Sequence, residues 1–323
     1  MEPNLFHYAS SELSQDAFLL WLLEWANPAN AEYDFELHKT ASDFLWQILD
    51  ADEDFAIHSV TCEKQKYHID VLAFLNDKIA VIIEDKVNSL EHGDQIARYR
   101  KNLAEALGSL YDIRCVYLKT GNECLTKLRC QSEKGNFKIC TRKNILDILE
   151  KSKSSNPILR DFVLNLKQLD EWTESFRTKL YSEWKRDVAP WQGFYSWLEE
   201  NAEEWLEWRY VSNPKGGFWA CFGHWKWSEE YNSTLYLQFE QERICIKADS
   251  RPQKETVKSC YEKLASSAAR VGIHLEKPRF HRGQYVTVGF ADTRVFFPSD
   301  VFDEKEVLEK WNLLKGILDE VAK

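Results

Sequence analysis

Residues 67–88, YHIDVLAFLNDKIAVIIEDKVN, contain an apolar run that ends directly in Glu84-Asp85-Lys86. Charged side chains at the end of a buried strand lose hydration, and this loss is costly unless a partner compensates it. Successive side chains of a strand point to opposite faces, so Glu84 and Lys86 share one face while Asp85 lies on the other. A carboxylate and an ammonium are therefore expected on the same side of this strand.

Two strand-like segments, 68–76 and 78–87, flank an Asn-Asp pair that favours a tight turn. We expect them to form an antiparallel hairpin. Asp70 lies far from the turn in the first segment, as Glu84 and Lys86 do in the second. The hairpin therefore predicts that two carboxylates and an ammonium meet at one end of the sheet.

Two carboxylates held close together repel each other unless a cation lies between them, and oxygen ligands of this charge select Mg²⁺ or Mn²⁺. Such a cation stabilises charge on a phosphodiester under attack and activates a bound water. Lys86 would orient or help to deprotonate that water, or stabilise the developing charge. The alternative is an ordinary Glu and Lys pair on a sheet edge, which contributes a few tenths of a kcal/mol.

The order of these residues resembles that of the PD-(D/E)xK, or restriction-endonuclease-like, nuclease superfamily. Ile69-Asp70 is followed after thirteen residues by Glu84-Asp85-Lys86, with Ile in place of the Pro of the family name. The stretch 11–28, SELSQDAFLLWLLEWANP, resembles the first helix of a bacterial branch, and 94–100, DQIARYR, resembles the Gln-x-x-x-Tyr helix that follows the catalytic strand. The resemblance covers about residues 8–150.

The resemblance implies a role for each matching residue. Asp70 and Glu84 would bind the divalent metal, with the backbone carbonyl of Asp85 as a third ligand and Lys86 as the catalytic lysine. The resemblance also implies that Glu12 completes the acidic pocket as a further metal ligand and that Gln95 positions Lys86 or a backbone phosphate, with Tyr99 one turn further along the same face. Tyr99 and Arg98 are candidate nucleic-acid contacts, although charges on a helix surface are ordinarily just solvated. His92, in the loop before Gln95, could contact a phosphate, but plain exposure to solvent is the favoured expectation.

The pattern along the chain predicts an α/β domain over residues 1–170, with a mixed sheet flanked by helices. Helical spacing covers 14–28, 33–51 and 94–108, and strand-like runs cover 54–62, 68–76, 78–87 and 112–121. A strand and a helix follow in 136–150, before the Ser- and Lys-rich stretch 151–156.

Residues 171–323 predict a second, α+β domain that is rich in tryptophan. We expect a helix over 190–210, strands over 216–227, 234–241, 243–250 and 284–297, and helices over 253–271 and 302–322. Core packing is a better account of Trp197, Trp205 and Trp208 than base stacking, because glutamates surround them. The most basic stretch, 277–282, supplies Lys277, Arg279 and Arg282 as candidate nucleic-acid contacts.

Composition limits the classes of function. The net charge of −10 disfavours a protein that coats nucleic acid by bulk charge but permits a local basic cleft. No apolar run is long enough to span a membrane, and the polar start lacks a secretory pattern, so a cytoplasmic location is expected. The eight cysteines lack the paired spacing of a zinc site and are expected to be reduced and mostly buried.

The leading hypothesis is a Mg²⁺- or Mn²⁺-dependent nuclease, most simply an endonuclease, with DNA favoured over RNA and a setting in bacterial restriction or defence. Its second domain would recognise the substrate, an activating protein or a second copy of the chain. One alternative is a catalytically silent module that kept the nuclease fold to bind a protein or a nucleic acid. A small-molecule hydrolase is another, although no Gly-rich phosphate loop or Ser-His pattern favours it.

Overall fold

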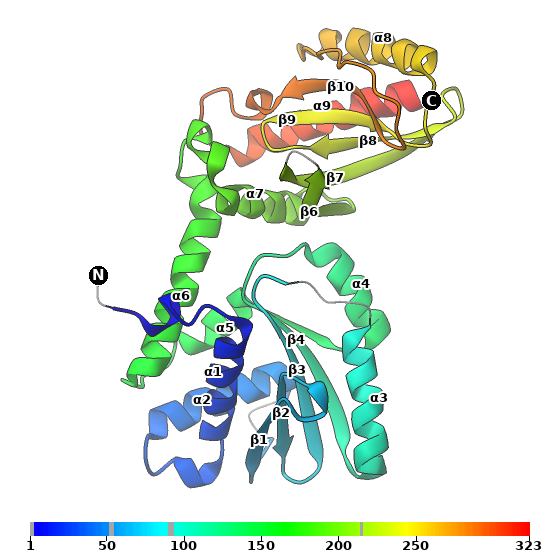
Figure 1. Cartoon of the computed structure of the whole chain (residues 1–323). Coiled ribbons are helices and arrows are strands. Elements are labelled where there is room, and N and C mark those ends of the chain that lie inside the picture. Colours follow the sequence, from blue (N-terminus) through cyan, green and yellow to red (C-terminus); the bar gives the residue numbers. More distant parts are fainter. Residues whose placement is uncertain (1–2, 52–54, 90–93, 214–215) are drawn as a thin grey trace. The chain divides into compact units, whose positions relative to one another are not determined.

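The computed structural model describes residues 3–51, 55–89, 94–213 and 216–323 (Figure 1). The chain divides into two compact units, the first made of residues up to 122 with 128–171, and the second of 123–127 with 172–323. Each unit has its own five-stranded sheet and its own apolar core.

The first unit contains a mixed sheet in the order β1-β2-β3-β4-β5. Its strands are β1 (Val60–Lys64), β2 (Val71–Leu75), β3 (Ile79–Lys86), β4 (Asp112–Lys119) and β5 (Lys138–Thr141). The first three strands are antiparallel, and β4 and β5 run parallel to β3. The predicted hairpin is confirmed, since Leu75 is paired with Ile79 on either side of the Asn-Asp turn.

The strand expected over 54–62 begins later, at Val60. The backbone N–H groups of His58 and Ser59 donate to the side-chain oxygen of Asn76, at 2.7 and 3.2 Å, instead of joining a strand ladder. A turn side chain therefore takes the donors that a longer strand would have used, which is typical of Asn in turns.

Helices cover both faces of this sheet (Figure 1). The helices are α1 (Glu12–Trp25), α2 (Phe35–Leu49), α3 (Gln95–Leu107), α4 (Leu125–Gly135), α5 (Arg142–Leu149) and α6 (Pro157–Glu174). The helix α1 contacts β1, β2 and β3, and its apolar side chains join alternate strand residues such as Val81 and Ile83 in one core. The helix α3 contacts β3 and β4, where it forms the crossover between these parallel strands.

The second unit is built on an antiparallel sheet in the order β10-β9-β8-β7-β6. Its strands are β6 (Leu206–Asn213), β7 (Gly216–Ser228), β8 (Ser233–Phe239), β9 (Arg243–Ala248) and β10 (Val286–Asp292), and its helices are α7 (Val188–Asn201), α8 (Lys254–Arg270) and α9 (Glu304–Ala322). The mixed α/β architecture of the described residues is consistent with the expected fold class.

Two expected boundaries in the second unit are wrong. The helix expected over 190–210 ends at Asn201, and Leu206 begins a strand that pairs with β7. The Trp and Glu residues of this stretch fit a helical period and a strand period equally well, and pairing with β7 decides between them. The strand expected over 284–297 ends at Asp292, whose carboxylate caps the short turn that follows by accepting from the Arg294 N–H at 2.8 Å.

Aromatic side chains fill the core of the second unit. Trp184, Trp191 and Trp311 are fully buried there. Trp197 and Trp208 are also buried, as expected, but the expectation is wrong for Trp205, which is 47% exposed.

Two further expectations concerned the state of the cysteines and the presence of membrane-spanning segments. All eight cysteines are free thiols, five of them buried, and burial raises the pKa of Cys140 to about 12. Each helix among the described residues is too short or too polar to cross a lipid bilayer.

Candidate active site

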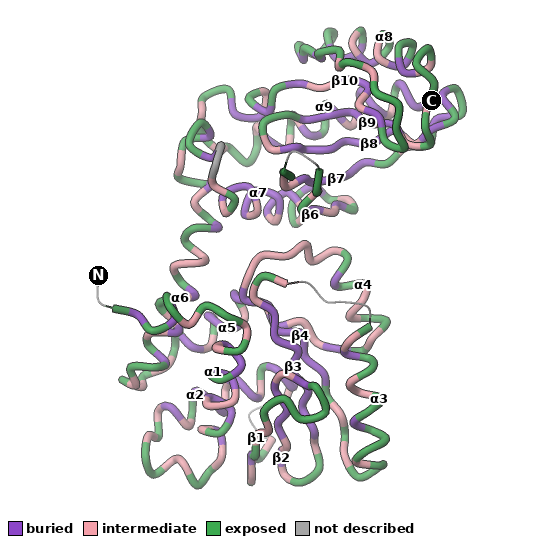
Figure 2. The backbone as a smooth tube through the Cα atoms, viewed as in Figure 1, coloured by how far each residue is buried: buried purple, intermediate pink, exposed green. Residues whose placement is uncertain are grey.

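The β2–β3 hairpin places Asp70, Glu84 and Lys86 on one face of the sheet. Asp70 directly precedes β2, and extending the pairing of Val71 with Ile83 by one step sets Asp70 opposite Glu84. Alternation puts Lys86 on the same face, the one that α3 covers. Both strands are buried along most of their length (Figure 2), so these polar side chains lie at the buried end of an apolar layer.

The ammonium of Lys86 lies between the two carboxylates. Its Nζ atom forms an ion pair with Oε1 of Glu84 and lies 3.6 Å from Oδ2 of Asp70. It also donates to the backbone carbonyl of Asp85 at 3.1 Å. Glu84 is fully buried, whereas the side chain of Asp70 is 28% exposed. The site therefore opens toward solvent on the Asp70 side.

The surroundings of Lys86 keep it charged. Burial acts to lower the pKa of Lys86, but the contact with Glu84 and the charges of Asp70 and Glu12 outweigh burial and raise this pKa. The ammonium of Lys86 is therefore a cation that these two carboxylates share.

The side chain of Asp85 points to the opposite face, toward α1. Its Oδ1 atom accepts from the side-chain amide of Gln15, whose own Oε1 accepts from Thr120 Oγ1 at 2.8 Å. The carbonyl of Thr120 accepts from Arg142 Nη1 at 2.7 Å. A continuous polar chain therefore runs from α5 through α1 to the strand that carries Glu84 and Lys86.

Asp16 is buried beside Asp85, and its position was not predicted from the sequence. Burial, followed by the nearby charge of Asp70, raises the pKa of Asp16 to about 6. Burial also raises the pKa of Asp85 well above its usual range. Within the described part of the chain, Oδ1 of Asp16 and Oδ2 of Asp85 receive no N–H or O–H donor. Two carboxylates buried side by side would repel each other, so we expect the two carboxyl groups to share one proton.

Glu12 holds the chain that leaves β3. Its Oε1 atom accepts from the N–H groups of Val87 and Ser89, at 3.0 and 3.4 Å, and from the Ser89 hydroxyl at 2.6 Å. Burial acts to raise the pKa of Glu12, but these bonds and the charge of Lys86 outweigh it and lower the pKa. This geometry favours a positioning role for Glu12 over the expected role as a metal ligand.

Gln95 and Tyr99 lie one turn apart on α3, and Gln95 Nε2 lies 2.7 Å from the Tyr99 hydroxyl. Gln95 therefore contacts Tyr99, and its expected role in positioning Lys86 or a backbone phosphate stays a prediction. Burial raises the pKa of Tyr99, and the charges of Glu84 and Asp70 add to this rise. Tyr99 thus lies close enough to Glu84 and Asp70 to feel their negative charges.

Two further candidate nucleic-acid contacts, Arg98 and His92, were expected on the α3 side of the site. Arg98 is exposed on α3. His92 lies outside the described residues.

A second buried lysine also lies near the end of β3. Lys119 of β4 pairs in register with Lys86, and its Nζ atom donates to the Ser89 carbonyl at 2.5 Å. Glu12 and Lys119 therefore hold the same residue after β3 from two different elements. The burial of Gln15 and Asp16 could have been predicted from the sequence, because both continue the apolar stripe of Leu19 on α1. No pattern in the sequence indicated the position of Lys119.

The three basic candidates of the second unit, Lys277, Arg279 and Arg282, do not all lie at one place. Arg279 and Arg282 line a cavity together with Arg243. Lys277 is directed elsewhere, with its Nζ atom 5.2 Å from the centre of the Tyr261 ring.

The donor set fits a hard divalent cation. Among the described residues, no cluster of three or more Asp, Glu, His or Cys side chains forms a ready metal cage. Mg²⁺ does not need one, because it keeps several waters and takes one or two protein carboxylates. Asp70 and Glu84 already converge on a single cation, the ammonium of Lys86, with the Asp85 carbonyl within its reach.

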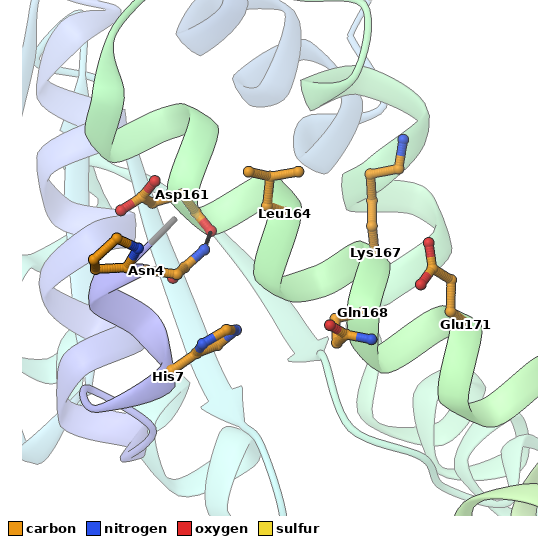
Figure 3. Close-up of a pocket in the computed structure, with 8 residues that line it drawn as sticks. Asn4, His7, Asp161, Leu164, Lys167, Gln168 and Glu171 are labelled. Carbon is orange, nitrogen blue, oxygen red and sulfur yellow. Dashed lines mark hydrogen bonds between the residues drawn. The ribbon is translucent and has the colours of Figure 1, made fainter. Parts of the chain in front are cut away.

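A cavity of about 300 Å³ lies elsewhere in the first unit, between the N-terminal segment and α6 (Figure 3). Its lining includes His7, Lys167 and Glu171, and the side-chain amide of Asn4 donates to the Asp161 carbonyl there at 2.7 Å. None of the site carboxylates described above lines this cavity, so it plays no part in the candidate active site.

Comparison with known proteins agrees with this geometry. A model of the PD-(D/E)XK nuclease superfamily matches residues 3–213, about two thirds of the chain. The match includes the whole β2–β3 hairpin and extends through α7 and β6 of the second unit. No curated protein and no solved structure matches the chain. The chain belongs to the PD-(D/E)XK nuclease superfamily.

Proposed function

We propose that the protein is a divalent-metal-dependent endonuclease that hydrolyses phosphodiester bonds of DNA. The observation that carries this proposal is the convergence of Asp70 and Glu84 on the ammonium of Lys86. DNA as the substrate and a bacterial restriction or defence setting rest on the resemblance of residues 8–150 to the bacterial branch of the superfamily. The cytoplasmic location is the expectation drawn from the composition of the sequence.

Asp70, Glu84 and the carbonyl of Asp85 would hold Mg²⁺ or Mn²⁺. When bound, such an ion stabilises negative charge on the phosphate and lowers the pKa of a coordinated water. Asp70 would be the ligand that is partly exposed to solvent. Glu84 is buried and is held in place by its ion pair with Lys86. Hydrolysis forms one bond from water oxygen to phosphorus and breaks one bond from phosphorus to a sugar oxygen. The attacking water gives up a proton to solvent, and the released sugar oxygen takes up a proton from solvent.

Lys86 would keep its proton and stabilise the charge that builds on the phosphate oxygens. The position of its ammonium supports this role, because Nζ forms an ion pair with Glu84 and lies 3.6 Å from Oδ2 of Asp70, beside the proposed metal ligands. The bonds from Gln15 to Asp85 and from Ser89 to Glu12 would fix the end of β3 that carries this lysine. Tyr99 would border the substrate from α3.

The experiment compares cleavage of single- and double-stranded DNA and RNA in Mg²⁺, Mn²⁺ and EDTA. Lys86→Ala and Glu84→Gln are expected to lower the rate by about 100-fold or more, as losses of an electrostatic stabiliser do. The matched control is Lys101→Ala, because Lys101 lies on α3 with a side chain that is 77% exposed. Cleavage that both site variants retain would refute the site.

The wild-type protein itself separates the proposal from a silent module. A silent module predicts no cleavage of any of the four substrates and no binding of Mg²⁺ or Mn²⁺ by titration calorimetry. A nuclease with a single site per chain would cut both strands of a duplex most simply as a homodimer. Sedimentation with and without duplex DNA tests that arrangement and reveals whether an activating partner is needed.

A further inference from the structure

A basic cavity lies in the second unit and is lined mainly by the loop between α8 and β10 and by the start of β10. Its volume is about 360 Å³, and its lining joins the loop residues Arg279, His281 and Arg282 to Arg243 of β9. Among the described residues that line it, none is an aspartate or a glutamate. The cavity is therefore positively charged in a chain whose net charge is −10.

Arg243 is held in place by a buried carboxylate. Arg243 Nε donates to Oε2 of Glu240 at 2.7 Å, while Lys247 Nζ forms an ion pair with the other oxygen at 2.7 Å. Glu240 is only 7% exposed and is thus shared by two cations. The guanidinium of Arg243 also lies 5.6 Å from the centre of the Phe290 ring. Arg243 is therefore preorganised, and its cluster with Glu240 and Lys247 stays cationic.

In the described part of the chain, the two loop arginines have no carboxylate beside them in the lining of the cavity. Among the described residues, no ion pair joins Arg279 or Arg282 to a carboxylate. Tyr285 lines the same cavity and is 66% exposed, which leaves much of its ring free to solvent. Guanidinium groups beside an open aromatic ring match a phosphate next to an unpaired base.

We propose that this cavity binds a phosphate and the adjacent base of a single-stranded nucleic acid. The inference rests on the proposed function and names the form of substrate strand that the second unit holds. A single strand is favoured over a duplex because stacking on Tyr285 requires a free base face, which a duplex hides. Lys277 is not part of this cavity, since its ammonium lies on the Tyr261 ring.

Binding is tested with the full-length Lys86→Ala chain in EDTA, by fluorescence anisotropy over a series of salt concentrations. The probes are a single strand of about 12 nucleotides, within the site size of single-strand-binding folds, and a duplex of the same length. Each lost phosphate contact should lower the slope of log K against log salt by about 0.7 for a single strand. Arg279→Gln and Arg282→Gln are expected to show this change.

Tyr285→Ala separates stacking from charge. It should weaken single-strand binding by about 5- to 150-fold with an unchanged salt slope, the range that corresponds to one lost stacking contact. The matched control is Lys305→Gln, which removes a cation at an 86% exposed side chain on α9 of the same unit. Melting temperatures of all variants establish that each one is folded.

The proposal is overturned by unchanged affinity and salt slope in the Arg279→Gln, Arg282→Gln double variant. Equal effects of Lys305→Gln would also overturn it, because they would indicate diffuse charge instead of a site. A duplex bound as tightly as the single strand, with no effect of Tyr285→Ala, would do the same. The proposed function can fail independently, since absent cleavage leaves these binding measurements intact.

Discussion

Replacement of Asp16 by Asn should stabilise the folded protein in a pH-dependent way. Burial and the charge of Asp70 raise the pKa of Asp16 from its ordinary 3.8 to about 6. A carboxyl with a raised pKa binds its proton more tightly in the folded state than in the unfolded state. The free energy of unfolding therefore falls as the pH rises between these two values, and the full cost is present above about pH 6.

The magnitude follows from the difference between the two pKa values. A rise from 3.8 to about 6 corresponds to about 3 kcal/mol, at about 1.4 kcal/mol for each pKa unit. Asn cannot ionise, and its amide can donate to Asp85 in the place of the shared proton. Asp16→Asn should therefore leave stability nearly unchanged near pH 4 and raise it by up to about 3 kcal/mol at pH 8.

The assay is scanning calorimetry in EDTA at pH 4 and pH 8. For a unit of this size, about 3 kcal/mol raises the melting temperature by about 6–12 °C. Asp147→Asn, the same substitution at an exposed position of α5, controls for the general effect of removing a negative charge. An equal rise at both pH values, or no rise at pH 8, would show that Asp16 is not held near an unfavourable charge.

Two other changes test the surroundings of the site. Gly121→Ala should lower both the melting temperature and the cleavage rate, because a Cβ atom there would lie 1.9 Å from the Val87 carbonyl; Gly316→Ala on α9, with open space around it, is the control in thermal melts. Mg²⁺ at about 100 times its dissociation constant should stabilise the wild type by about 2.7 kcal/mol, and Asp70→Asn should remove most of this gain, as thermal shifts with and without Mg²⁺ would reveal.

The hairpin was predictable because every signal for it is local. The Asn-Asp turn, the alternating strand faces and the apolar run of β3 all lie within 67–88, and together they place Asp70, Glu84 and Lys86 on one face. The stretch around 203–210 was not predictable in this way. Its pattern suits a helix and a strand alike, and only pairing with the distant strand β7 decides the outcome.

The supporting half of the site depends on contacts between residues far apart in the sequence. Gln15 bonds to Asp85 across 70 residues, and Thr120 bonds to Gln15 across 105. The resemblance links Glu12 of α1 to the acidic pocket, but it gives no role to Gln15 or Asp16, whose contacts with Asp85 appear only in the folded structure. The position of Lys119 follows from the parallel pairing of β3 with β4, which sets its side chain beside Lys86.

The cost of this arrangement argues for catalysis over a silent scaffold. Asp16 and Asp85 lie buried against each other, and the charge of Asp70 also acts on Asp16. Apolar side chains of similar volume would stabilise the folded state as well or better, because the interactions of buried charges seldom offset the free energy lost on their desolvation. Groups with strongly shifted pKa values beside an accessible carboxylate are instead typical of a site that binds a cation and a charged substrate. If Asp16→Asn gains stability while cleavage falls, the same carboxylates that weaken the fold are the ones that the chemistry requires.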